Sequence, residues 1–173
     1  ATAVSALFAG VAQAEDVKLG IIYGFTGPIE SLTGSMAAAS EAAIEEVNAS
    51  GLFMDGAKVS AVRADSTCTD AAVATAAAER LVTSDKVNGI LGGDCSGVTA
   101  AILSNVAVPN GIAMISPSAT SPALSTAEDQ GLFFRTAPSD AREGEIAADI
   151  MTERGIKTAA LTYSNSDYGK GLA

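Results

Sequence analysis

The sequence predicts an α/β fold in which a parallel sheet has helices on both faces. Short apolar runs of strand length alternate along the chain with longer segments whose apolar residues recur at helical spacing. Glycine, proline and small polar residues separate the two kinds of segment, as turns require. Strands that alternate with helices form parallel sheets with right-handed crossovers. A composition of 48% hydrophobic and 17% charged residues is that of a globular chain.

The first strand is expected over Val17–Tyr23, an apolar run that ends at a glycine. Further strands should span residues 58–64, 87–91, 112–116 and 132–136, with helices over 34–48, 71–82 and 96–106. Gly51 suits the left-handed position after the first helix, and Thr69 or Asp70 can cap the second. These elements predict an N-terminal ligand-binding lobe that occupies residues 15–137.

Residues 138–173 are expected to begin a second α/β lobe. Asp140 and Glu143 have the spacing of a capping box for a helix over 141–154, and an apolar run over 157–163 predicts one more strand. The last ten residues begin a loop and a helix. One strand with one helix cannot cover both faces of a sheet of its own, so this lobe should be incomplete.

Residues 1–14 are expected to be the remnant of a secretory signal peptide. They form an apolar run that ends in the small-x-small pattern Ala12-Gln13-Ala14, directly before the charged Glu15 and Asp16. The run is shorter than the roughly 20 residues that a membrane-spanning helix needs. An amphipathic core helix is the alternative. A signal peptide predicts export to the periplasm.

Ten Lys and Arg against twenty Asp and Glu give a net charge of −10. Such a surface repels phosphate backbones, so nucleic acid is not expected as a partner. The charge does not exclude a small anionic ligand, because backbone N–H groups and hydroxyls can bind an anion within an acidic protein.

Cys68 and Cys95 fit an oxidising compartment, where an even number of cysteines favours a disulfide. Both follow the carboxyl ends of predicted strands that we expect to be neighbours. The alternative is a thiol hydrolase, because residues 93–97 (GDCSG) match the G-x-nucleophile-x-G pattern between a strand and a helix. The chain contains no histidine to activate such a thiol, which favours the disulfide.

Ligands of open parallel sheets bind beyond the carboxyl ends of the strands. Ser96 lies where the third strand leads into a helix, so its hydroxyl and the neighbouring amides can hold a carboxylate; a plain helix N-cap is the alternative. The loop 116–121 offers more hydroxyls, although a Ser/Thr turn explains it equally. Residues 24–28 (GFTGP) lack the glycine spacing of a nucleotide loop, and the acidic residues are scattered at expected helix ends and surfaces. No metal or other cofactor is therefore expected.

Six short motifs follow one another in order from the first strand to the end of the chain. They are GII at 20–22 with TGP at 26–28, DSTC at 65–68, GILG at 89–92 with CS at 95–96, ISPSATSP at 115–122, FRT at 134–136 and DYGKG at 167–171. Each motif is weak alone. Together, their order and spacing resemble the branched-chain amino-acid-binding (Leu/Ile/Val-binding) family of type I periplasmic solute-binding proteins, the receptors of ATP-driven (ABC) importers.

The resemblance implies that Cys68 pairs with Cys95 and that the Ser96 hydroxyl holds the carboxylate of the ligand. It implies that the segment Ser118, Ala119 and Thr120 offers a carbonyl to the ammonium and an N–H and hydroxyl to the carboxylate. Tyr168, from the second lobe, would close over the ligand, unless it is simply a packed loop aromatic.

By this resemblance the protein is a non-catalytic, monomeric receptor that binds an amino acid or a similar small carboxylate or amide between two lobes and delivers it to an inner-membrane permease. A ligand-sensing domain of a larger receptor is an alternative on the same fold. The loop 27–34 is one residue longer than is usual in the family, and residues 97–99 (GVT) replace a hydroxyl-rich run. Both departures border the pocket for the ligand side chain, so the sequence does not identify the solute.

Overall fold

The computed structural model describes residues 15–173, and its centre is a parallel five-stranded sheet with the order β2-β1-β3-β4-β5. The strands are β1 (Val17–Tyr23), β2 (Val59–Asp65), β3 (Gly89–Gly92), β4 (Ala113–Ser116) and β5 (Phe133–Arg135). All five strands predicted for the first lobe are confirmed, with ends that differ by at most two residues. The prediction of residues 1–14 as a signal peptide lies outside the described residues.

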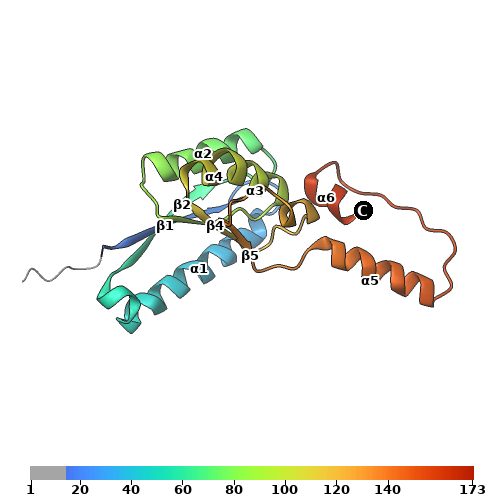
Figure 1. Cartoon of the computed structure of the whole chain (residues 1–173), viewed down its shortest axis with the longest axis horizontal. Helices are drawn as coiled ribbons and strands as arrows, with labels where there is room; N and C mark the ends of the chain where they lie inside the picture. The colour runs from blue at the N-terminus through green and yellow to red at the C-terminus, as the bar shows by residue number, and fades with distance from the viewer. Residues whose placement is uncertain (1–14) are drawn as a thin grey trace, which may run out of the picture.

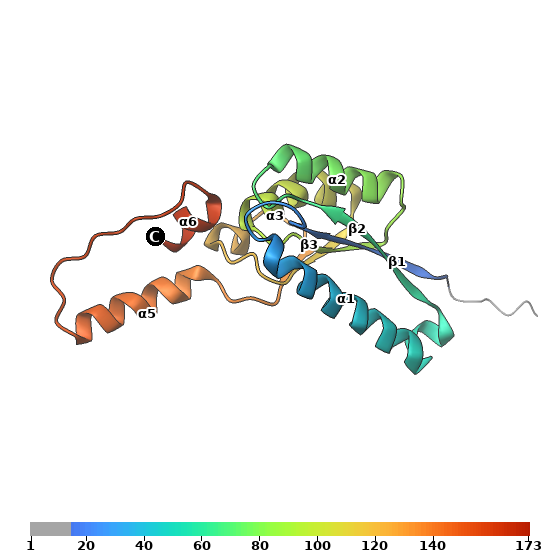
Figure 2. The ribbon, with the colours of Figure 1, turned by 180° about the vertical axis from the view of Figure 1, so that it is seen from behind.

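Helices cover both faces of the sheet, as predicted (Figures 1 and 2). The helix α1 (Glu30–Ser50) lies on one face, and α2 (Ala71–Thr83) and α3 (Ser96–Ile102) lie on the other. Strand β1 is buried from both sides, because Ile22 belongs to the larger core under α2 and α3, while Ile21 and Tyr23 pack towards α1. A short 3-10 turn, η1 (Phe53–Gly56), joins the α1 side to β2.

Two helix ends confirm local predictions, and two helices are longer than predicted: α1 begins four residues before and ends two residues after its predicted range, 34–48. Asp70 caps α2, since its carboxylate accepts from the amides of the first turn, and Gly51 ends α1 with a φ of 64°. The helix predicted over 96–106 continues from α3 through a π turn, η2 (Leu103–Ala107), into α4 (Val108–Asn110). It stops at Gly111, whose φ of 66° is a left-handed conformation that favours glycine.

The order of the strands corrects one prediction. We expected β2 and β3 to be neighbours, but β1 lies between them. The disulfide between Cys68 and Cys95 nevertheless forms, with a Cα–Cα distance of 5.3 Å, because both loops reach over the end of β1. A Cβ atom on Gly24, the residue after β1, would lie 3.0 Å from the Cβ of Cys68. A glycine at this position therefore leaves room for the crossing.

The helix α5 (Asp140–Glu153) extends away from the sheet, and a long segment leads back to α6 (Asp167–Leu172), which packs against α3 and the 3-10 turn η3 (Pro122–Ser125) (Figures 1 and 2). The predicted strand over 157–163 is wrong. Leu161 and Tyr163 are 72% and 58% exposed, and the segment pairs with no strand within residues 15–173. A strand needs a neighbouring strand to satisfy its backbone groups, and an apolar pattern alone does not supply one.

The capping box predicted at Asp140 is also wrong. Ser139 is the N-cap of α5, and its hydroxyl accepts from the amide of Ala141. Asp140 is only 4% exposed, and its carboxylate accepts from the hydroxyl of Thr120 in the loop after β4. None of the helices in residues 15–173 is long and apolar enough to cross a membrane.

Candidate functional site

The loops at the carboxyl edge of the sheet are joined by a buried carboxylate, that of Asp94. This side chain is 3% exposed. One oxygen accepts from the amide of Gly24 at 2.7 Å, and the other accepts from the hydroxyl of Ser66 at 3.3 Å and from the amide of Cys95 at 3.0 Å. Asp94 therefore fixes the ends of β1, β2 and β3 relative to one another.

Asp94 was not predicted as a site residue, because the acidic residues were expected at helix ends and on surfaces. The available signal was its position: an acidic residue directly after a buried strand and two glycines, at the edge of the sheet where loops from several strands meet. Asp140 was misplaced in the same way.

Ser116, the last residue of β4, holds the start of the next loop. Its buried hydroxyl donates to the carbonyl of Gly93 at 2.5 Å and accepts from the amide of Ala119 at 3.0 Å. The hydroxyl of Ser118 donates to the carbonyl of Asp94 at 2.9 Å. The loops that follow β3 and β4 are therefore bound to each other, which brings Ser96 near residues 118–121.

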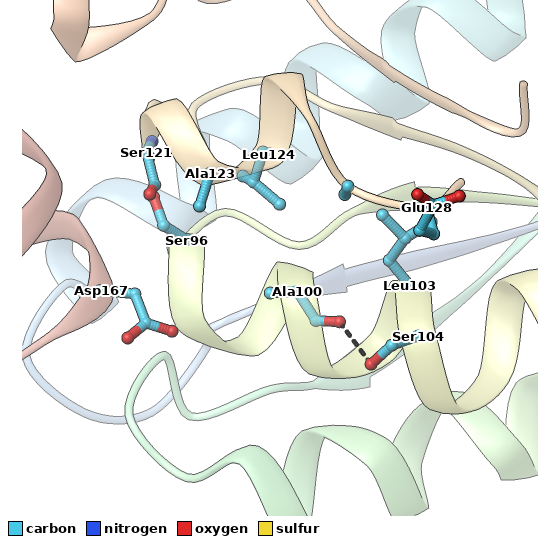
Figure 3. A pocket seen from close by; sticks show the side chains of 10 residues that line it. Ser96, Ala100, Leu103, Ser104, Ser121, Ala123, Leu124, Glu128 and Asp167 are labelled. Carbon is cyan, nitrogen blue, oxygen red and sulfur yellow. Dashed lines mark hydrogen bonds between the residues drawn. The ribbon is translucent and has the colours of Figure 1, made fainter.

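Ser96 is 3% exposed, and it is not the N-cap of α3, because that position belongs to Cys95. Its oxygen accepts from the amide of Ser121 at 3.1 Å. A serine hydroxyl has one hydrogen to donate besides its lone pairs. Within residues 15–173 no acceptor takes that hydrogen, so the Ser96 hydroxyl can donate to a ligand (Figure 3).

The backbone of the loop 118–121 has almost every group paired. The amides of residues 118, 119 and 121 donate to serine oxygens, the carbonyls of 119 and 121 accept from Arg135, and the carbonyl of 120 accepts from the amide of Asp140. Two groups have no partner within residues 15–173, the carbonyl of Ser118 and the N–H of Thr120. One acceptor and one donor are therefore available at the edge of the sheet.

The side chains of Thr120 and Tyr168 lie in other surroundings than the side chain of Ser96. The hydroxyl of Thr120 donates to the carboxylate of Asp140 at 2.9 Å, so its hydrogen is already engaged. Tyr168 lies on α6 and is 48% exposed. Ser96 lines a cavity of about 270 Å³, Thr120 lines a second cavity of about 230 Å³, and Tyr168 lines neither. The structure places Ser96 beside the 118–121 loop but does not gather all five predicted residues around one cavity.

The cavity beside Ser96 lies between α3, η3 and α6 (Figure 3). Its lining is mainly apolar, with the acidic side chains of Glu128 and Asp167 among the polar groups. Helix α6 approaches closely, because a Cβ on Gly171 would lie 2.7 Å from Pro122 and one on Gly97 would lie 3.4 Å from the carboxylate of Asp167. The glycines allow α6 to rest directly on the first lobe.

The loop after β1 is held from the side of β2 by Asp65. Its carboxylate accepts from the hydroxyl of Thr26 at 2.6 Å and from the amide of Thr67 at 2.8 Å. Burial acts to raise the pKa of Asp65, but the hydrogen bonds from Thr26 and from nearby amides outweigh it, so the pKa lies below its usual value. Asp65 therefore favours its anionic form and holds the loop after β1 by hydrogen bonds.

Two observations at this edge of the sheet concern a catalytic thiol and a metal site. Cys95 is bonded to Cys68, so the thiol that a hydrolase would need is not free. Within residues 15–173 no three His, Cys, Asp or Glu side chains gather as metal ligands. The edge offers unpaired hydrogen-bond donors and acceptors that suit a small polar ligand.

Comparison with known proteins identifies the family of this chain. A family model described as periplasmic binding protein matches residues 16–173, and the chain belongs to this family. The resemblance found in the sequence motifs is thereby confirmed.

Relatives with known names include the Leu/Ile/Val-binding protein of Escherichia coli K12, 32% identical over 171 residues, which are 98% of this chain and 45% of the relative. A protein of Pseudomonas aeruginosa that binds leucine, isoleucine, valine, threonine and alanine is 33% identical over 96% of this chain and 44% of its own length. This chain thus spans about half the length of the relatives it matches.

Solved structures show the same fold. The substrate-binding protein LivJ of Streptococcus pneumoniae, in complex with isoleucine, has a TM-score of 0.79 at 31% identity and matches 91% of this chain and 44% of its own. The leucine-binding protein LivK of Thermotoga maritima has a TM-score of 0.76 at 27% identity, over 90% of this chain and 43% of its own.

Proposed function

We propose that the full-length protein is the substrate-binding component of an ABC importer, exported to the periplasm, where it acts as a monomer and delivers its solute to an inner-membrane permease. The relatives and solved neighbours that bind branched-chain amino acids support an amino acid as the solute. The protein is a binder and not an enzyme, which agrees with the disulfide at Cys95.

The proposal divides the chain into an anchoring lobe, residues 15–137, and the start of a closing lobe, residues 138–173. The ligand binds first to the first lobe, and a hinge motion then brings the second lobe over the bound ligand. Tyr168 comes from the closing side, on a helix that already rests against α3. The relatives' greater length supplies the rest of a second lobe in this scheme.

The observation that carries the proposal is the pair of unpaired backbone groups next to Ser96. The hydroxyl of Ser96 and the N–H of Thr120 both donate to the ligand carboxylate, and the carbonyl of Ser118 accepts from the ammonium. In this arrangement Thr120 acts through its backbone, because its hydroxyl is engaged with Asp140. Hydrogen bonds to a charged group contribute about 1.5 to 3 kcal/mol each, which makes the carboxylate contacts the main anchors.

Calorimetry on the full-length protein tests this function. L-leucine, L-isoleucine, L-valine and benzoate are titrated beside L-leucinamide, which lacks the carboxylate. We expect at least one acid to bind and the amide to bind at least about tenfold more weakly than leucine. If no acid binds, or if the amide binds as well as the amino acid, the carboxylate site is wrong.

Ser96→Ala provides the matching test on the protein, with Ser104→Ala as its control. Ser104 lines the same cavity, but its hydroxyl donates to a carbonyl of its own helix. Ser96→Ala should weaken binding of the acid at least about tenfold, and Ser104→Ala should leave it unchanged. Equal affinity in the Ser96 variant and the wild type would contradict the assignment of Ser96.

A further inference from the structure

Arg135, the last residue of β5, reaches the 118–121 loop from the side of the sheet. Its Nη1 donates to the carbonyl of Ala119 at 3.1 Å and to the carbonyl of Ser121 at 2.9 Å, and its Nη2 donates to the hydroxyl of Ser125 at 2.5 Å. The backbone of Arg135 is paired with Ser116 in the sheet, so the side chain starts from a fixed point. One guanidinium thus donates hydrogen bonds to the backbone on both sides of Thr120.

The hydrogen bond from Arg135 to the Ala119 carbonyl also determines the direction of the Thr120 N–H. The carbonyl of Ala119 and the N–H of Thr120 belong to one planar trans peptide group and point in opposite directions. A donor that holds the Ala119 oxygen therefore also sets where the Thr120 N–H points. No partner within residues 15–173 holds that N–H itself, so its direction depends on the carbonyl at the other end of the peptide.

The neighbouring peptides are fixed by different residues. The group that carries the Ser118 carbonyl is held through the amide of Ala119, which donates to the hydroxyl of Ser116. The group that carries the Thr120 carbonyl is held at both ends, by Asp140 and by Ser96. Arg135 is the residue that holds the peptide between them.

We propose that Arg135 is a positioning residue for ligand binding: it aims the Thr120 N–H at the ligand carboxylate without touching the ligand. This inference rests on the proposed function of the site. Arginine suits the task because a single Nη1 carries two N–H groups and reaches two carbonyls at once, whereas the lysine ammonium is a compact group on a flexible stem.

The test compares the full-length wild type with Arg135→Met, Arg135→Lys and the control Arg63→Met. Arg63 is an arginine of β2 that pairs with Glu41 on the surface, away from the loop. Calorimetry measures the affinity of each variant for one acid, which is the one among L-leucine, L-isoleucine, L-valine and benzoate that the wild type binds most tightly. Amide NMR spectra follow Thr120 with and without that acid, and urea unfolding measures the stability of each variant.

Arg135→Met should bind at least about tenfold more weakly, Arg135→Lys should recover part of the affinity, and Arg63→Met should bind as wild type does. The Thr120 amide should shift downfield with ligand in wild type and shift less in Arg135→Met. A variant that keeps wild-type affinity and the wild-type Thr120 shift overturns the inference. So does an affinity loss in Arg135→Met with a wild-type Thr120 shift, because the arginine would then act on stability alone.

The two proposals fail in different ways. Wild type that binds no acid of the panel removes the proposed function, and the inference about Arg135 with it. Wild type that binds an acid while Arg135→Met binds it equally well removes the inference only. If Arg135→Met does not fold, Arg135→Lys carries the same comparison of affinity and Thr120 shift, with the same outcomes.

Discussion

Replacing Asp94 with alanine should loosen the carboxyl edge of the sheet. The carboxylate is 3% exposed and accepts from the buried amides of Gly24 and Cys95 and from the hydroxyl of Ser66. Hydrogen bonds to a charged group contribute about 1.5 to 3 kcal/mol, and a buried donor left unpaired costs about 1 to 3 kcal/mol. Because a methyl group offers no acceptor to either amide, we expect Asp94→Ala to cost about 3 kcal/mol or more of stability.

Asp94→Asn separates the loss of hydrogen bonds from the loss of volume. Asparagine keeps one acceptor oxygen but places an NH₂ group where the second oxygen was. In either orientation that NH₂ faces a backbone N–H, of Gly24 or of Cys95. We therefore expect Asp94→Asn to lower the free energy of unfolding by about 2 kcal/mol, which is less than the loss expected for the alanine variant.

Native-state hydrogen exchange on the full-length protein measures the effect where it arises. The amides of β1 and β3 report the free energy that opens this part of the sheet, independently of a second lobe that unfolds separately. Asp85→Ala is the control, because Asp85 pairs with Arg80 near the surface and such pairs contribute about 1 kcal/mol or less. If Asp94→Ala reduces protection in β1 and β3 no more than Asp85→Ala does, Asp94 does not stabilise this edge of the sheet.

Two further predictions concern the same edge of the sheet. Replacing Cys68 and Cys95 with alanine opens a cross-link between residues 27 apart and should lower the free energy of unfolding by about 3.5 kcal/mol in the chain-entropy model. Urea unfolding of the variant, beside wild type with and without reductant, measures this, and a change below about 1 kcal/mol would contradict it. The lowered pKa of Asp65 means that its stabilising effect is complete above the usual carboxyl pKa and is lost as the pH falls through the folded value. Stability should therefore fall less between about pH 5 and about pH 2 in Asp65→Asn than in wild type, and equal falls would show that Asp65 has no such effect.

The sequence predicted the elements of the first lobe because their signals are local. Strand β1 has its predicted ends, since an apolar run stops at a glycine, and α2 begins where Asp70 can cap it. The order of the strands has no comparable signal. Which strand lies beside which depends on how the crossovers pass over the sheet, so the place of β1 between β2 and β3 was missed.

The segment 157–163 shows that an apolar run alone does not predict a strand reliably. Its apolar residues would suit a strand, but within residues 15–173 no strand pairs with it, and Leu161 stays 72% exposed. Strand formation depends on a partner strand, which is often far away in sequence, whereas helix α5, whose backbone hydrogen bonds are internal, forms over nearly its predicted length.

The candidate site was predictable in position but not in detail. The rule that ligands bind beyond the carboxyl ends of parallel strands points to Ser96 and to residues 118–120. Which hydroxyl is free and which is engaged depends on contacts between distant residues, such as Ser96 with Ser121, Thr120 with Asp140, and Arg135 with the loop. These contacts are set by the fold, and no local spacing reveals them.

In the proposed function, the first lobe anchors the ligand by its carboxylate. A crystal structure of the full-length protein, with the acid that binds most tightly in calorimetry, tests it most directly. We expect the carboxylate to accept from the Ser96 hydroxyl and the Thr120 N–H at about 3 Å, and an ammonium, if the ligand has one, to donate to the Ser118 carbonyl. A carboxylate held by other groups, with the Thr120 N–H turned away from it, would contradict the proposed carboxylate site.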